Sequence, residues 1–168
     1  RVIESLFLSR HKIMKQCIVD SFELLTKYHK ENREVIEGWL TNGAYNVNRR
    51  FIYPRVVEYK NHGDWIDCSY NYKSINELED LEKSLVNISS TNSIKHEFCL
   101  AELLRNKIKN REFRKWHDST FFKFKLFQKG TVHFEFKDKY IWTKFNELAV
   151  EGKEWLPEEV KKSRHRFH

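Results

Sequence analysis

Glycine and proline are scarce in this sequence, with five glycines and two prolines among 168 residues. A loop that holds the phosphates of a nucleotide needs closely spaced glycines, and the chain has neither a P-loop nor a GxGxxG motif. It also lacks the GxSxG motif that places the nucleophile of many hydrolases. These absences exclude nucleotide-hydrolysing and dinucleotide-binding proteins, and we expect no cofactor.

Cysteine is scarce as well, and long hydrophobic runs are missing. The three cysteines, Cys17, Cys68 and Cys99, are odd in number and far apart, which argues against a disulfide framework and fits a reducing compartment. No apolar run approaches the ~18 residues that a membrane span requires. The N-terminus shows no signal-peptide pattern. We therefore expect a cytoplasmic protein with no membrane partner.

Aromatic residues are abundant, with 13 Phe, 7 Tyr and 5 Trp, and hydrophobic residues make up 40% of the chain. This composition lies far from that of a disordered protein. At this length, folding buries about 70% of the surface of the unfolded chain, which is enough for one hydrophobic core. We expect a single domain over residues 1–168. Because the chain begins at Arg1 rather than at methionine, we expect that domain to come from a longer protein.

Apolar residues at helical spacing predict five helices. The first is long and runs from about Ile3 to Tyr28, and a shorter one lies between an Asn32 cap and a Gly43 stop. The capping box Ser74-x-x-Glu77 predicts the start of a third helix. A fourth follows from Ile94 to Ile108, and a last helix is expected between an Asp138 cap and Gly152 as its stop signal.

Alternation of apolar and polar residues predicts strands in two places. Between Asn46 and Tyr72 we expect two or three strands, broken by Pro54 and by a turn at His62-Gly63-Asp64. Residues 122–136 predict a β-hairpin with a Lys129-Gly130 turn. The expected buried face of this hairpin, packed against the long N-terminal helix or the last helix, consists of Phe122, Phe124, Leu126, Val132, Phe134 and Phe136. The predicted fold class is therefore α+β, with a small antiparallel sheet packed by helices.

Positive charge is concentrated in one region of the chain. The sequence has 31 Lys and Arg against 24 Asp and Glu, and residues 101–137 contain ten basic and four acidic side chains. Aromatic residues are interleaved with them, so that phosphates could meet the cations while bases stack on an exposed ring. The sequence predicts a non-catalytic nucleic-acid-binding domain. The candidate contacts are Arg111, Arg114, Lys115, Lys123, Lys125, Lys129 and His133.

Two alternatives to nucleic-acid binding remain open. Lysines on the open face of a hairpin, and basic residues at a helix end, also occur simply as solvated surface. The acidic segment 64–82, with six acidic residues and one lysine, fits a protein-interaction or structural domain. No zinc-finger spacing, ribonucleoprotein signature or clear helix-turn-helix is present, so direct readout of sequence is not expected. Arg49-Arg50 forms a second small basic point, which we interpret as an ordinary strand edge.

Few residues suggest catalysis. Glu135-x-Lys137, with Asp118 as a second carboxylate, has the spacing of one class of metal-dependent nucleases, and His133 beside Glu135 could act as an acid–base pair. Such short patterns arise by chance in a chain that is one-third charged, and an exposed surface pair is favoured. His96-x-x-Cys99 supplies half a zinc site without a second half, so a buried thiol is favoured and no metal is expected.

Several segments of the chain carry a family pattern, and they lie at residues 32–39, 46–54, 121–123, 129–138, 145–146 and 155–157. The most specific are Lys-Gly-Thr-x-His-x-x-Phe, from Lys129 to Phe136, and Phe145-Asn146. Together these segments resemble the domain of unknown function 4942 family over nearly the whole chain. Gly130 is explained by a turn that needs positive φ, whereas His133 on the polar face of the hairpin has no such structural explanation.

The resemblance implies a context rather than an activity. Members of this family are bacterial, occur on mobile elements and plasmids, and some are joined to or lie near adenine-specific DNA methyltransferases. The chain lacks the glycine-rich cofactor loop and the Asn/Asp-Pro-Pro-Tyr type motif that a methyltransferase needs. The resemblance thus favours DNA over RNA as the bound nucleic acid. It implies an accessory domain of a mobile-element or DNA-modification system, with a DNA methyltransferase as a partner.

Overall fold

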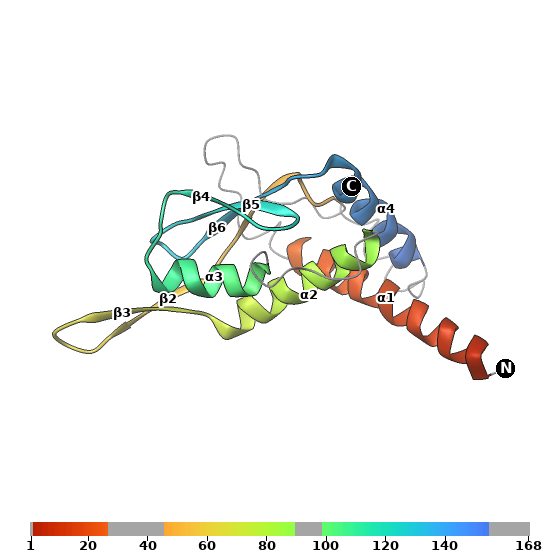
Figure 1. The fold of residues 1–168 in the computed structure, drawn as a ribbon, viewed down its shortest axis with the longest axis horizontal. Helices are drawn as coiled ribbons and strands as arrows, with labels where there is room; N and C mark the ends of the chain where they lie inside the picture. Colours follow the sequence, from red (N-terminus) through yellow and green to blue (C-terminus); the bar gives the residue numbers. More distant parts are fainter. Residues whose placement is uncertain (1, 27–45, 90–98, 155–168) are drawn as a thin grey trace, which may run out of the picture.

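The computed structural model describes residues 2–26, 46–89 and 99–154, in which groups of antiparallel strands lie between helices along the chain (Figure 1). The helices are α1 (Val2–Thr26), α2 (Tyr72–Ile88), α3 (Leu100–Lys109) and α4 (Lys139–Glu154). The strands are β1 (Arg50–Tyr53), β2 (Val57–Asn61), β3 (Ile66–Tyr70), β4 (Trp116–Asp118), β5 (Phe122–Leu126) and β6 (Val132–Phe136). The predicted α+β class is confirmed. The helix predicted over 32–43 and the start of the one predicted from Ile94, including His96, lie outside the described residues.

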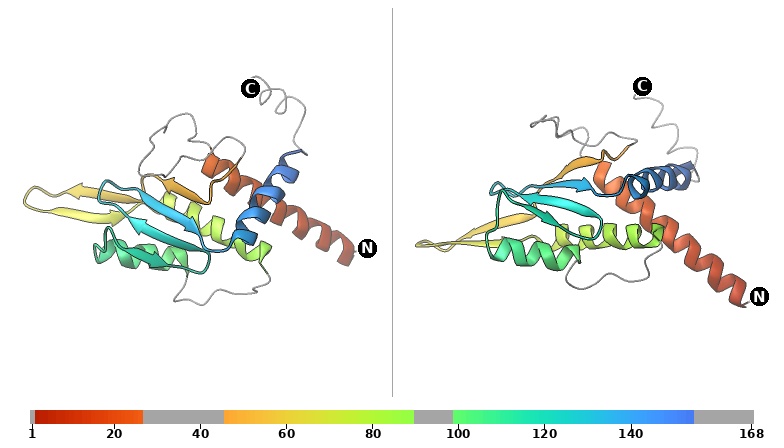
Figure 2. Two further views of the ribbon diagram at one scale, coloured as in Figure 1. Left: turned by 90° about the horizontal axis from the view of Figure 1, so that it is seen from above. Right: turned by 45° about the horizontal axis from the view of Figure 1, so that its top comes forward.

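The predicted hairpin forms the centre of a four-stranded antiparallel sheet rather than an isolated ribbon. The strand order is β1-β6-β5-β4, with Phe124 of β5 opposite Phe134 of β6. A separate two-stranded sheet, β2-β3, extends away from the rest of the fold (Figures 1 and 2). The first half of α1 projects from the opposite end of the molecule. No described helix has the length and apolar character that crossing a membrane would require.

The inward face of the large sheet is lined with phenylalanine, as the alternating pattern predicts. All six hairpin side chains that were expected to be buried are fully buried. Figure 1 shows α2 and α3 beneath this sheet, while α1 and α4 pack against each other at its end. Phe136 contacts Phe145 of α4 at 6.2 Å between ring centroids, and Phe145 contacts Phe22 of α1 at 6.1 Å. One continuous core therefore joins the sheet to the helices.

The turn of the hairpin fastens the two sheets together. Gly130 has φ +104, as predicted for this turn, and its carbonyl oxygen accepts hydrogen bonds from the backbone N–H groups of Val56 (2.8 Å) and Val57 (3.2 Å). A Cβ at this position would lie 2.9 Å from the Val57 carbonyl oxygen. Glycine is thus required both by the backbone conformation and by the close approach of β2.

The start of α2 differs from the capping-box prediction. Asn71 is the N-cap, and its side chain accepts a hydrogen bond from the Ser74 N–H at 3.1 Å. Ser74 lies inside the helix and donates its hydroxyl to the Arg55 carbonyl, and Glu77 accepts from the Tyr53 hydroxyl. The motif was misplaced because both of its side chains serve tertiary contacts, while an asparagine three residues earlier satisfies the helix end.

The end of α4 also differs from the prediction. Asp138 caps its start as expected, accepting from the Tyr140 N–H at 2.7 Å. Gly152, however, lies within the helix, which continues to Glu154. A Cβ on Gly152 would lie 2.4 Å from Cγ2 of Val19. The glycine therefore allows α4 to approach α1 closely and is not a stop signal.

A buried carboxylate that the sequence did not single out joins α2 to α3. Glu82 is 3% exposed and accepts hydrogen bonds from the Leu100 N–H at 3.0 and 3.2 Å, so it caps α3 from a neighbouring helix. Burial raises the pKa of Glu82 to about 7, while the Leu100 N–H and Cys99 oppose the shift. Cys99 itself is half-buried and packs against the core, in line with the favoured interpretation of this thiol.

Candidate functional site

The outer face of the four-stranded sheet, which is the face opposite the core, carries two rows of side chains that run across the strands. Pairing of the strands sets these rows, because alternate residues of neighbouring strands lie side by side. The first row contains Ile52, His133, Lys125 and Trp116, and the second contains Arg50, Glu135, Lys123 and Asp118. The rows bring together residues that are up to about 85 positions apart in the sequence.

A lysine lies between aromatic rings in the first row. The Lys125 Nζ is 5.5 Å from the centroid of the Trp116 ring and 5.8 Å from that of Phe127. Both distances are within the range of a cation–π interaction. The Phe127 ring in turn lies 4.3 Å from the His133 ring. We refer to Trp116, Lys125, Phe127 and His133 as the Lys125 cluster.

The expected exposure of His133 is wrong. The residue is 4% exposed, because β1 and β5 flank it on both sides and the Phe127 ring packs on it. Burial, together with the positive charges of Lys129 and Lys125, lowers the pKa of His133 to about 4. The imidazole is therefore neutral at pH 7. On the outer face it packs beneath Phe127 and contributes no positive charge.

The six basic candidates divide into two groups. Lys123 and Lys129 are exposed, and together with the half-buried Lys125 they give the outer face its positive charge. Arg111, Arg114 and Lys115 are exposed on the connection between α3 and β4. Arg111 turns toward the small sheet, where its guanidinium donates to the Ile66 carbonyl oxygen at 3.1 Å. Arg111 therefore belongs to a second location, whereas Arg114 lies beside the end of β5, where its backbone N–H donates to the Leu126 carbonyl oxygen at 2.8 Å. The three lysines are the basic candidates that the hairpin itself carries, and a shared face with Arg114 and Lys115 stays a prediction.

The nuclease candidates do not converge. Lys123 of β5 separates Asp118 of β4 from Glu135 of β6, so the two carboxylate-bearing positions are two strand spacings apart, about 10 Å. Glu135 pairs with Arg50 at 3.4 Å, and Asp118 pairs with Lys137 at 3.5 Å. Among the described residues, no group of three His, Cys, Asp or Glu side chains is placed to hold a metal ion.

Arg49 and Arg50, which the sequence analysis interpreted as part of an ordinary strand edge, make contacts at the β1 edge of the sheet. Arg50 forms the ion pair with Glu135, and the Arg49 Nε donates to the Phe136 carbonyl oxygen at 3.2 Å. Both arginines thus connect β1 or its approach to β6.

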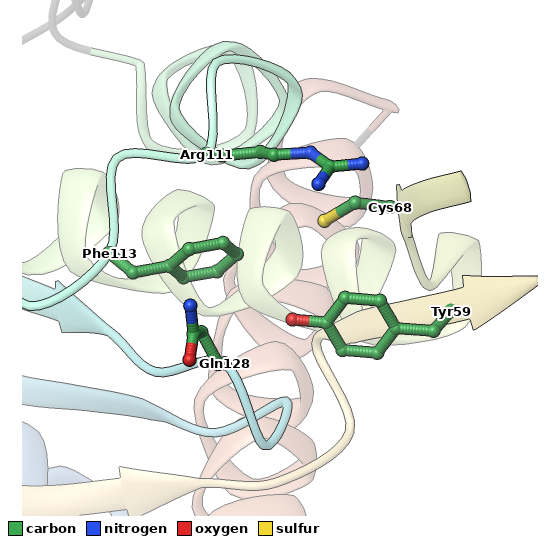
Figure 3. A pocket seen from close by; sticks show the side chains of 5 residues that line it. All are labelled: Tyr59, Cys68, Arg111, Phe113 and Gln128. Carbon is green, nitrogen blue, oxygen red and sulfur yellow. The ribbon is translucent and has the colours of Figure 1, made fainter. Parts of the chain in front are cut away.

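Arg111 lines a pocket of about 330 Å³ together with Tyr59, Cys68, Phe113 and Gln128 (Figure 3). Tyr59 and Cys68 are cross-strand partners in the small sheet, and Gln128 comes from the hairpin turn that Gly130 fastens to β2. Burial raises the pKa of the Cys68 thiol and that of the Tyr59 phenol, and Arg111 opposes both shifts. Sequence reasoning pointed to Arg111 and to Phe113, which is one of the aromatic residues interleaved with the basic ones. It missed Tyr59, Cys68 and Gln128, because they belong to no motif and reach the pocket through tertiary contacts.

Comparison with known proteins gives one result. The sequence model of a family described as "Domain of unknown function (DUF4942)" matches residues 1–155. Neither the curated proteins nor the solved structures contain a match.

Proposed function

The chain belongs to the DUF4942 family, whose function is unknown, and from that premise we propose that it is a non-catalytic accessory domain that binds DNA on the outer face of its four-stranded sheet. The observation that carries this proposal is the Lys125 ammonium held between the rings of Trp116 and Phe127. Lys123 and Lys129 flank it on the same side of the hairpin.

This arrangement is suited to a single strand. Exposed lysines neutralise phosphates without regard to sequence, and an exposed aromatic ring stacks on a base whose face is free. The Trp116 side chain is 49% exposed, so a base can reach its ring. Because stacking requires unpaired bases, we expect single-stranded DNA to bind more tightly than duplex DNA.

The accessory role is supported by the separation of the two candidate catalytic carboxylates on the outer face. Asp118 and Glu135 are each engaged by a basic side chain and lie on strands separated by β5. The chemistry of a DNA-modification or mobile-element system would then reside in a partner. The family resemblance supports an adenine-specific DNA methyltransferase in that place.

The test is fluorescence anisotropy with labelled single- and double-stranded DNA and RNA at two salt concentrations. The double variant Lys123→Glu/Lys125→Glu removes two phosphate contacts, so on single strands the slope of log K against log[salt] should become shallower by about 1.4. Lys123→Glu/Lys129→Glu changes two exposed side chains and so avoids disturbing the Lys125 cluster. The matched control is Lys60→Glu/Lys73→Glu, which makes the same charge change on exposed residues away from this face.

Weak binding by both outer-face variants, with wild-type binding by the control, supports the proposal. Undetectable binding of wild-type protein at low salt would refute it, as would equal loss in the control variant. Circular dichroism of each variant separates loss of binding from loss of fold.

A second function, protein interaction, is favoured by the projecting half of α1. Its exposed apolar residues include Ile3 (83%), Leu6 (66%) and Ile13 (62%). Clustered exposed apolar side chains often mark a protein-binding surface. Sedimentation velocity of the chain alone, and mixed with an adenine-specific DNA methyltransferase, tests this function. Association that Leu6→Gln/Ile13→Gln abolishes would favour it, whereas a monomer in both samples would count against it.

A further inference from the structure

We propose that the pocket formed by Tyr59, Cys68, Arg111, Phe113 and Gln128 binds one nucleotide unit, with the phosphate at Arg111 and the base against Phe113. The two sources of such a unit are a free mononucleotide and the 5′-phosphorylated end of a strand. The site uses none of the outer-face residues, so it stands independently of the DNA-binding surface proposed above.

Arg111 is positioned before any ligand arrives. Its backbone has φ +53, a left-handed conformation that is uncommon for a residue with a side chain. Its guanidinium is held at the small sheet by the hydrogen bond to the Ile66 carbonyl oxygen. A guanidinium has five N–H donors in a planar arrangement, and it binds phosphate through two of them at once. One bond to Ile66 therefore leaves donors for an oxyanion.

The other polar groups of the pocket favour an anion as well. Because the pKa of Cys68 and that of Tyr59 are both raised, the thiol and the phenol are neutral at pH 7 and do not repel a phosphate. Figure 3 shows the Tyr59 hydroxyl and the Gln128 amide turned into the space beside Arg111 and Phe113. A hydroxyl and an amide both donate hydrogen bonds. Among the residues that the structure describes, the pocket lining contains no acidic side chain, although the negative charge of Asp67 acts on Cys68 at its border.

Phe113 and the size of the pocket favour a ligand with one planar base. The Phe113 ring borders the space on the side away from Cys68 (Figure 3), where a planar base can lie against it. The volume of about 330 Å³ is at the small end of ligand pockets and suits a single nucleotide rather than a dinucleotide. Recognition by an arginine and an aromatic ring does not require the glycine-rich phosphate loop that the sequence lacks.

The experiment is an NMR titration of the ¹⁵N-labelled chain with uridine 5′-monophosphate, uridine and inorganic phosphate as separate probes. We expect saturable shifts at Tyr59, Cys68, Arg111, Phe113 and Gln128 with the monophosphate. Asparagine tolerates the left-handed conformation, so Arg111→Asn removes the guanidinium without adding backbone strain. This variant should weaken binding about tenfold or more, as expected for loss of a charge-assisted hydrogen bond.

The chain contains a matched control. Arg114 is a second exposed arginine with positive φ, 58°, three residues away and outside the pocket. Arg114→Asn should therefore bind the monophosphate as the wild type does. Gln128→Glu provides an independent variant, because it places a negative charge in the pocket from an exposed turn position without removing the Ile66 contact. It should also weaken binding about tenfold or more.

Loss in Arg111→Asn and in Gln128→Glu, with retention in Arg114→Asn, supports the site. Absence of saturable binding, wild-type affinity of Gln128→Glu, or equal affinity for uridine, inorganic phosphate and the monophosphate would overturn it. Tighter binding of 5′-phosphorylated than of 5′-hydroxyl trithymidylate identifies a strand end as the source, and tighter binding of the free monophosphate identifies a mononucleotide. If Lys123→Glu/Lys125→Glu retains monophosphate binding, the pocket binds its ligand independently of the outer face.

Discussion

Residues whose roles depend on a neighbour across the fold are those for which sequence reasoning was wrong. The periodicity of residues 132–136 correctly placed His133 on the face opposite the core, but exposure depends on what flanks the strand. Since β1 and Phe127 cover this position, the histidine is buried. Gly152 is a similar case, because a glycine near the end of a helix is usually a cap and the approach of Val19 is invisible in sequence.

Gly152→Ala tests the contact with Val19. Alanine favours a helix over glycine by about 1 kcal/mol, but the added methyl group would overlap a valine whose χ1 is nearly fixed in a helix. Overpacking of this kind costs about 1–3 kcal/mol, so we expect a net loss of stability of about 1 kcal/mol in urea unfolding. In the double variant Val19→Ala/Gly152→Ala the loss should be smaller than the sum of the two single losses. A more stable Gly152→Ala protein would show that α4 does not pack closely here.

At the scale of elements, the periodic spacing of apolar residues correctly predicted those helices and hairpins whose formation depends on local sequence. The hairpin β5-β6, the long helix α1 and the β2-β3 hairpin follow from apolar spacing and turn residues. The three-residue strand β4 was missed because so short a segment shows no period, and it is a strand because it pairs with β5. The pocket could not be predicted either, since Arg111, Cys68 and Gln128 come from three separate elements.

The corrected start of α2 gives an element-scale prediction. Asn71→Ala removes the side-chain acceptor of the Ser74 N–H, and loss of such a cap costs about 1 kcal/mol. Asn87→Ala, on an exposed position of the same helix, is the control and should be neutral or slightly stabilising because alanine has the higher helix propensity. Thermal unfolding followed by circular dichroism measures both. Equal stability of Asn71→Ala and wild type would argue against Asn71 as the cap.

For the whole molecule, two buried groups give opposite pH dependences of stability. The pKa of Glu82 is raised from 4.5 to about 7, so between these values the folded state binds more protons than the unfolded state and stability falls as pH rises. The pKa of His133 is lowered from 6.5 to about 4, so between these values the unfolded state binds more protons and stability rises with pH. Between about pH 4.5 and 6.5 the two contributions nearly cancel.

Single variants should therefore reveal a slope that the wild type lacks. With Glu82→Gln the His133 contribution remains, and stability should rise between pH 4.5 and 6.5 by up to about 1.4 kcal/mol per pH unit. With His133→Gln the Glu82 contribution remains, and stability should fall over the same range. The double variant should restore the wild-type slope at a different absolute stability. Urea unfolding at several pH values gives these slopes, and parallel profiles for all four proteins would contradict the assignment.

The pairing of β1 with β6 has a consequence for the biosynthesis of the chain. Arg50 of β1 pairs with Glu135 of β6, 85 residues later, and the Phe51 ring stacks on Phe134 at 5.3 Å. Contacts between segments so far apart in the chain form late, since the intervening loop must close first. While the ribosome is still making the middle of the protein, Phe51 has already emerged and its partner has not been synthesised. The nascent chain thus exposes an aromatic strand while these 85 residues are being translated, and its sheet is completed only when β6 has left the exit tunnel.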